Sequence, residues 1–127
     1  MTNSYPDFVS EQTQLKEIIN LAREKKAIDL IAIDVRGLSS ITDFFVICSG
    51  DSEPQVKAIT DNIRKGTAHK PIHLEGYENL NWVLLDYFDV VVHVFGKEDR
   101  GYYNIEKLWA DAPLNEFNDE TPKTADC

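Results

Sequence analysis

The segment from Trp82 to Phe95 constrains the fold more than any other part of the chain, because apolar and polar side chains alternate along it. Such alternation is typical of two β-strands joined by a tight turn. One face of this hairpin would be aliphatic and would carry Val83, Leu85, Val90, Val92 and Val94. The opposite face would carry Trp82, Leu84, Asp86, Asp89, Val91, His93 and Phe95. A tryptophan, two carboxylates and a histidine on one sheet face indicate a surface with a function rather than a plain core.

The turn of this hairpin is predicted to consist of Tyr87 and Phe88, so that Asp86 opposes Asp89 and Trp82 opposes His93. A three-residue turn would scatter the polar groups over both faces, and we therefore favour the two-residue register. Two-residue turns prefer Gly or Asn with positive φ, and carboxylates opposite each other repel. An unfavourable turn sequence and repulsion between carboxylates both destabilise the hairpin, and they are easier to explain on a functional surface than in a purely structural element.

The remaining sequence predicts one α+β domain. Its periodicity and turn signals indicate a helix at 10–26, strands at 27–35 and 44–48, a helix from about 52 to 66, a strand at 72–75, the hairpin, and a helix at 102–110. The order α-β-β-α-β-β-β-α predicts a mixed sheet of about five strands flanked by helices. We expect a flexible lead at 1–10, the domain at 11–113, and a disordered acidic tail at 114–127.

Composition excludes several classes of function. The chain has 13 basic and 22 acidic residues, a net charge of −9, whereas binding to nucleic-acid phosphates needs clustered Lys and Arg. Its basic residues lie near predicted helix ends, where a cation favours the helix dipole. No apolar run approaches the ~20 residues of a membrane helix, and no secretory signal is visible. Two cysteines make a poor disulfide framework, so a cytoplasmic setting is expected.

Three separated segments carry a family resemblance. They are Asp34–Gly50 (DVRGLSSITDFFVICSG), the hairpin Trp82–Phe95, and Tyr103–Pro113 (YNIEKLWADAP). Together they closely resemble the ribosomal silencing factor family, also called Iojap-related proteins, over about residues 15–113. The chain departs from the family pattern at Phe88, where glycine is common, and in a shorter segment before Pro71.

The resemblance implies a nucleotidyltransferase-like fold without a transferase activity. It also implies binding to a large-subunit ribosomal protein, number fourteen of the universal set, at the surface where the subunits join. The bound protein would sterically block the small subunit and repress translation when nutrients fall. Aromatic anchors and acidic groups of the hairpin would make this contact, which selects Trp82, Leu84, Asp86, Tyr87, Asp89, His93 and Phe95 as partner-binding residues.

Three alternatives compete with this interpretation. Trp82 and Phe95 could instead pack under the predicted final helix. The exposed face could pair two copies of the chain, giving a homodimer. In an enzyme, the turn at 49–52 would hold a phosphate while Asp86 and Asp89 bind a metal ion for nucleotide transfer. The two acids lie roughly 35 residues after that turn, and the hairpin has no Lys or Arg. We therefore expect no catalytic residue, no metal site and no cofactor.

Overall fold

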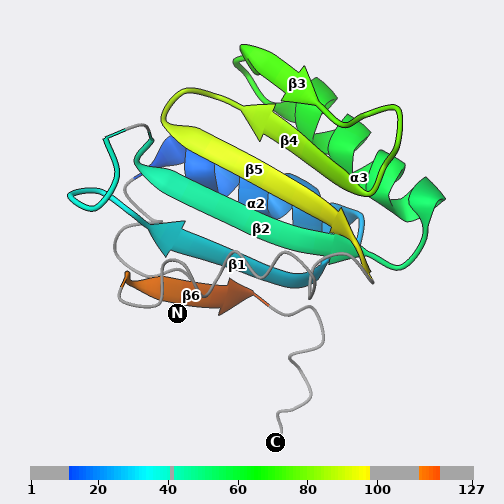
Figure 1. The fold of residues 1–127 in the computed structure, drawn as a ribbon, viewed down its shortest axis with the longest axis horizontal. Coiled ribbons are helices and arrows are strands. Elements are labelled where there is room, and N and C mark those ends of the chain that lie inside the picture. The colour runs from blue at the N-terminus through cyan, green and yellow to red at the C-terminus, as the bar shows by residue number, and fades with distance from the viewer. Residues whose placement is uncertain (1–11, 41, 98–111, 118–127) are drawn as a thin grey trace, which may run out of the picture.

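Six strands form a single mixed sheet in the computed structural model, which describes residues 12–40, 42–97 and 112–117. The elements in chain order are α2 (Thr13–Glu24), β1 (Ile28–Asp34), β2 (Phe44–Gly50), α3 (Glu53–Gly66), β3 (His73–Glu75), β4 (Trp82–Asp86), β5 (Val90–Gly96) and β6 (Leu114–Phe117). The strand order is β3-β4-β5-β2-β1-β6 (Figure 1). The central pair, β2 and β5, is parallel, and the other neighbouring strands are antiparallel. The predicted α+β class with a mixed sheet is confirmed.

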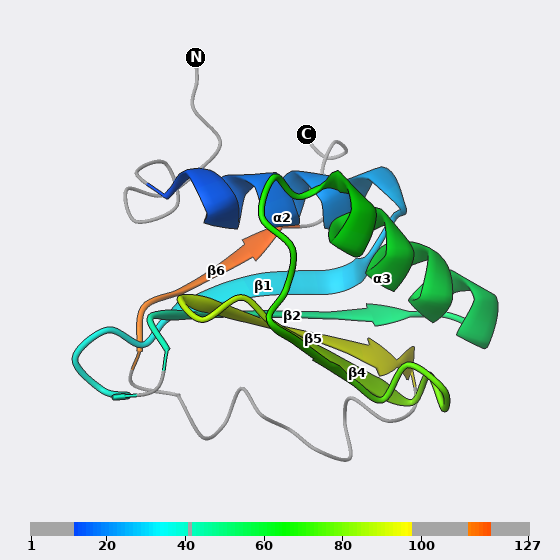
Figure 2. The same ribbon diagram turned by 90° about the horizontal axis from the view of Figure 1, so that it is seen from above.

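The two helices lie on the same face of the sheet (Figure 2). The predicted apolar stripe of α2 is buried there, and so is that of α3; the buried apolar residues are Leu15, Ile18, Ile19 and Ala22 in α2 and Val56, Ile59 and Ile63 in α3. Ser52 caps α3, because its Oγ accepts from Gln55 N–H at 3.3 Å. Gln55 Oε1 in turn accepts from Asp51 N–H at 2.6 Å. Neither described helix combines the length and apolar character needed to cross a membrane.

Lys70, just beyond the end of α3, binds the last carbonyl groups of that helix. Lys70 Nζ donates to the backbone oxygens of Arg64, Lys65 and Thr67 at 3.0–3.1 Å. These carbonyls lie at the negative end of the helix dipole, where a cation is favourable. The expected role of basic residues at helix ends is thus met here.

The main core lies between the helices and the sheet. The aliphatic hairpin face belongs to it as predicted, since Val83, Leu85, Val90, Val92 and Val94 are all buried in this cluster. Cys48 is fully buried in the same cluster and behaves as a small core residue.

The hairpin register differs from the predicted one by two residues. Asp86 pairs with Val91, Leu84 with His93, and Trp82 with Phe95. Tyr87 N–H donates to Val90 O at 2.8 Å, so Phe88 and Asp89 form the turn. A shift of two residues leaves the paired side chains on the faces that alternation predicted and changes only their partners, whereas Asp89 moves into the turn. The expected pairing of Asp86 with Asp89, and its repulsion, does not occur.

The acidic tail does not begin as a disordered segment. Its first four residues form β6, which pairs antiparallel with β1 from Leu30–Phe117 to Ile33–Leu114. Phe117 is 4% exposed and joins the main core, which anchors this strand. The predicted lead at 1–10, the predicted helix at 102–110 and the tail after 117 lie outside the described residues.

Candidate docking face

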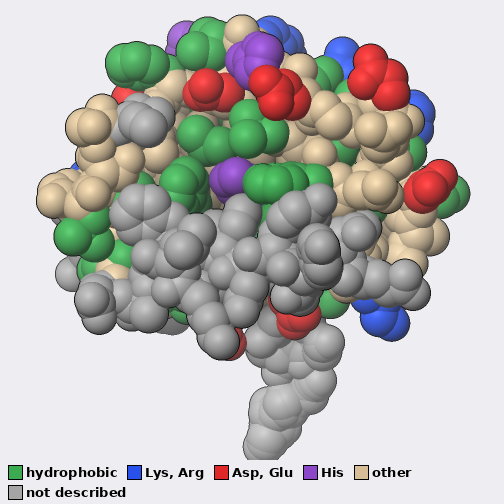
Figure 3. Space-filling view, in the orientation of Figure 1, with side chains coloured by type: hydrophobic (Ala, Val, Ile, Leu, Met, Phe, Trp, Pro, Cys, Tyr) green, Lys and Arg blue, Asp and Glu red, His purple; other side chains and the backbone are tan. Residues whose placement is uncertain are grey.

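The sheet face turned away from the helices carries the candidate site. Strand registers place three parallel rows of side chains on it. We call these three rows together the aromatic face. The first row consists of His73, Asp86, Val91, Phe45 and Ile33, and the second of Glu75, Leu84, His93, Ile47 and Ile31. The third row consists of Trp82 and Phe95. Figure 3 shows hydrophobic side chains in the middle of this view and acidic ones toward β3.

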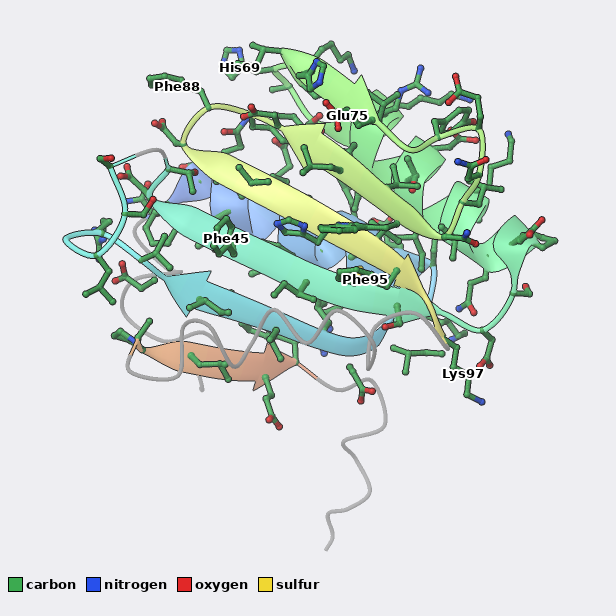
Figure 4. The ribbon with its side chains drawn as sticks, viewed as in Figure 1. Phe45, His69, Glu75, Phe88, Phe95 and Lys97 are labelled. Atoms are coloured by element: carbon green, nitrogen blue, oxygen red, sulfur yellow. The ribbon has the colours of Figure 1, made fainter. Side chains whose placement is uncertain are left out.

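An aromatic cluster forms the centre of this face. The rings of Trp82 and Phe95, which are cross-strand partners, stack with centroids 5.2 Å apart at 27°. The ring of Phe45 meets the imidazole of His93 edge-on at 5.3 Å and 76°. Figure 4 shows Phe45 and Phe95 on the viewer's side of β2 and β5. Aromatic pairs in these geometries contribute more stabilisation than their buried area alone would give, and they fix the orientation of the rings.

His93 has a defined protonation state. Trp82 Nε1–H donates to His93 Nδ1 at 2.9 Å, and an indole nitrogen can only donate. His93 Nδ1 must therefore be unprotonated, and the proton of the neutral ring lies on Nε2. His93 is 6% exposed, and burial lowers its pKa from 6.5 to about 4. Its Nε2 is buried and has no hydrogen-bond partner in the described parts of the chain.

Five of the seven predicted partner-binding residues lie on the aromatic face. Trp82, Leu84 and Asp86 are half-buried on the aromatic face, whereas His93 and Phe95 are buried in it. Asp89 is exposed in the turn, outside the three rows. Its role and that of the others as contacts remain predictions, because they rest on the sequence.

Tyr87 differs from the position expected of it. Its side chain lies in the helix-covered core, 6% exposed, and its hydroxyl is 3.0 Å from Thr67 Oγ1. Burial raises the pKa of this tyrosine. The position expected from the sequence was wrong, because Tyr87 was taken as a turn residue, whereas it is the last residue before the turn and points to the side of Leu85.

The acidic groups at the β3 side are partly engaged within the protein. Asp86 Oδ1 accepts from Phe88 N–H at 2.8 Å and so holds the turn. His73 and Glu75 are exposed neighbours on β3, with Nε2 and Oε2 2.6 Å apart. Sequence analysis did not select this pair, which shares the aromatic face through the pairing of His73 with Asp86 and Glu75 with Leu84. Only the strand pairing could have revealed it.

A nucleotide-transferring enzyme would need the phosphate-binding turn and the carboxylates close together. A cleft of about 260 Å³ lies at the ends of β2 and β5 and is lined by residues that include Gly50, Ser52 and Lys97. Gly50 pairs with Gly96, whereas Asp86 pairs with Val91, five positions earlier on β5. At about 3.3 Å per residue, roughly 16 Å of strand separates the cleft from the carboxylate. Phosphoryl transfer needs these groups to converge on one point.

The Gly50 turn has a structural explanation of its own. A Cβ on Gly50 would lie 2.8 Å from the backbone nitrogen of Val56 in α3. The glycine therefore permits the close approach of the helix to the strand end. In the described parts of the chain, no three His, Cys, Asp or Glu side chains are placed to bind a metal ion.

Comparison with known proteins agrees with the fold and the motifs. A family model described as "Ribosomal silencing factor during starvation" matches residues 9–126. This chain belongs to the ribosomal silencing factor family. Membership places it among ribosome-associated regulators of translation, as the sequence motifs predicted.

Bacterial relatives are similar over nearly their whole length. The ribosomal silencing factor of Halalkalibacterium halodurans is 49% identical over 112 residues, covering 86% of this chain and 96% of that protein. The Bacillus subtilis ribosomal silencing factor is 42% identical over 113 residues, with 87% and 96% covered. A crystal structure from Bacillus halodurans matches with a TM-score of 0.73 and 45% identity over 84% of this chain and 99% of that one.

Proposed function

We propose that this protein silences ribosomes by docking on the large subunit and sterically preventing the small subunit from joining. The surface that fits this role is the aromatic face, and the observation that carries the proposal is the half-buried Trp82 stacked on Phe95 at its centre. Clustered aromatic rings with a polar rim are the usual anchors of protein interfaces. This mechanism requires only that the protein binds the large subunit tightly and occupies the space that the small subunit would enter; it requires no catalytic turnover and no cofactor.

The partner that fits is a basic protein of the large subunit, and we propose the ribosomal protein numbered fourteen at the subunit-joining surface. The chain carries a net charge of −9, with Asp86 and Glu75 on the aromatic face and Asp89 exposed in the adjoining turn. Complementary charge accelerates association and sets orientation. The setting that we propose is the cytoplasm under nutrient limitation.

The experiment is to measure binding of Trp82→Ala to isolated large subunits and the rate at which small subunits then join. Loss of a central anchor is expected to weaken binding by about 2 kcal/mol or more, roughly 30-fold, and to restore subunit joining. Leu38→Ala is the matched control, since Leu38 is 56% exposed and lies outside the aromatic face. Wild-type affinity of a folded Trp82→Ala protein contradicts the proposed docking face.

Two other functions give different results in the same assays. A homodimer through the aromatic face predicts that Trp82→Ala dissociates the free protein in sedimentation velocity. Nucleotide transfer predicts metal-dependent turnover of labelled nucleotide that is lost in Asp86→Ala. The distance between Asp86 and the Gly50 cleft disfavours the transfer reaction.

A further inference from the structure

His93 supports Trp82 from within the sheet. Its imidazole is 6% exposed, whereas the indole beside it is half-buried. The two rings are joined by the 2.9 Å hydrogen bond from Trp82 Nε1–H to His93 Nδ1. A partner approaching the aromatic face therefore meets the indole, and His93 acts mainly through it.

Neighbouring rings prevent the imidazole from turning freely. Phe45 packs edge-on against it at 5.3 Å, and Phe95 lies nearly parallel to it at 6.2 Å and 9°. The acceptor atom Nδ1 is thus held at a fixed place. Because the indole also stacks on Phe95, both its tilt and its rotation are defined before any partner arrives.

A histidine at this position brings a penalty to folding stability beside the hydrogen bond that it accepts. With Nδ1 accepting from Trp82, Nε2 carries a proton that is buried without a partner in the described parts of the chain. A buried, unsatisfied N–H lowers stability, and a phenylalanine of similar shape would avoid that penalty, although it would also remove the acceptor of the half-buried Trp82 N–H. Residues that weaken the fold in this way are expected where a site needs them.

We propose that His93 is a positioning residue for ribosome docking, whose Nδ1 holds the Trp82 indole in its binding orientation. This inference rests on the proposed function and changes the role expected for His93 from direct contact to orientation. Ordering a side chain in advance removes that ordering cost from the binding step.

The test compares His93→Phe with His93→Asn in binding to isolated large subunits. Phenylalanine keeps the ring and removes the acceptor, whereas Asn Oδ1 can occupy the place of Nδ1 and accept from the indole. His93→Phe is expected to melt near the wild-type temperature, because removal of the unpartnered Nε2–H offsets loss of the indole hydrogen bond, and yet to bind about 3- to 10-fold more weakly. His93→Asn is expected to regain most of the affinity.

A spectroscopic signature separates positioning from a general structural effect. The indole N–H resonance of Trp82, identified by its disappearance in Trp82→Phe, is expected to shift in His93→Phe and to exchange with solvent about tenfold faster. In His93→Asn it is expected to return toward the wild-type position. If His93→Phe fails to fold, His93→Leu removes the acceptor with a smaller side chain and takes its place.

Failure of this inference is distinct from failure of the proposed function. Wild-type affinity for folded His93→Phe, together with weak binding by Trp82→Ala, overturns the positioning role and leaves the docking face intact. Wild-type affinity for both variants overturns the docking face itself. Equal weakening by His93→Phe and His93→Asn, with an unchanged indole resonance in both, also overturns the positioning role.

Discussion

The two faces of the sheet are built on different principles. The helix-covered face is aliphatic, and along the hairpin it consists of valines and a leucine that are almost fully buried. The aromatic face mixes rings, carboxylates and an imidazole nitrogen that has no hydrogen-bond partner among the described residues. The first face gives the fold its stability, and the second retains groups that stability alone would not favour. This difference supports the proposal that the aromatic face is the docking surface.

The adjacent leucines of β4 give the most direct test of this contrast. Leu85 is fully buried against the helices, whereas Leu84 is half-buried on the aromatic face. Leu85→Ala is expected to lower the free energy of unfolding by about 3 kcal/mol, and Leu84→Ala by about 1 kcal/mol. Urea denaturation measures both. Equal losses for the two variants would contradict the division of the faces.

Lowering the pH is expected to destabilise the folded protein through protonation of His93 on the aromatic face. Burial lowers its pKa in the folded protein from 6.5 to about 4, so the unfolded chain binds the proton more readily. The contribution of His93 is therefore fully present above pH 6.5 and is lost as the pH falls toward 4, by about 3 kcal/mol. Denaturation of wild type and His93→Phe across this range measures it. A pH slope that persists unchanged in His93→Phe would assign the effect to other groups.

Tyr87→Phe tests the face to which Tyr87 belongs. Thr67 Oγ1 donates to Ile63 O and leaves its oxygen to accept from the buried Tyr87 hydroxyl. Removing that hydroxyl is expected to lower the free energy of unfolding by about 1 kcal/mol and to leave binding to large subunits unchanged. Reduced binding by a folded Tyr87→Phe protein would return Tyr87 to the docking surface.

Replacement of the turn residue Phe88 is expected to change the free energy of unfolding least. It has φ +77°, is 68% exposed, and lies at the end of the hairpin (Figure 4). Phe88→Gly relieves the steric strain of positive φ but adds freedom to the unfolded chain, so a net gain of about 0.5 kcal/mol is expected. Phe88→Ala retains the Cβ and is the control, with no gain expected. Thermal unfolding distinguishes the two.

Sequence patterns predicted the local elements better than their pairing. The stripes of α2 and α3 and the alternation of the hairpin carry strong periodic signals, and all three are confirmed. The hairpin register was wrong by two residues because turn preferences could not anticipate Phe88 at positive φ. The error left the faces intact because the shift was even.

Long-range contacts account for what the sequence could not reveal. Strand β6 has only Leu114 and Phe117 as apolar residues, and it forms through its pairing with β1. The His73–Glu75 pair joins the aromatic face only through the pairing of β3 with β4. The hydrogen bond between Trp82 and His93 likewise crosses from β4 to β5 and depends on ring orientation. No local pattern encodes these contacts.

Strand β6 also has a consequence for solubility. It covers the outer edge of β1 from Leu30 to Ile33, a β-branched and apolar stretch whose backbone would otherwise be free to pair with another chain. β6 itself is short and presents the charged Glu116, features that discourage further strand addition. A chain ending at Pro113 would therefore expose an edge prone to intermolecular pairing, so the first residues of the acidic tail protect the protein from aggregation.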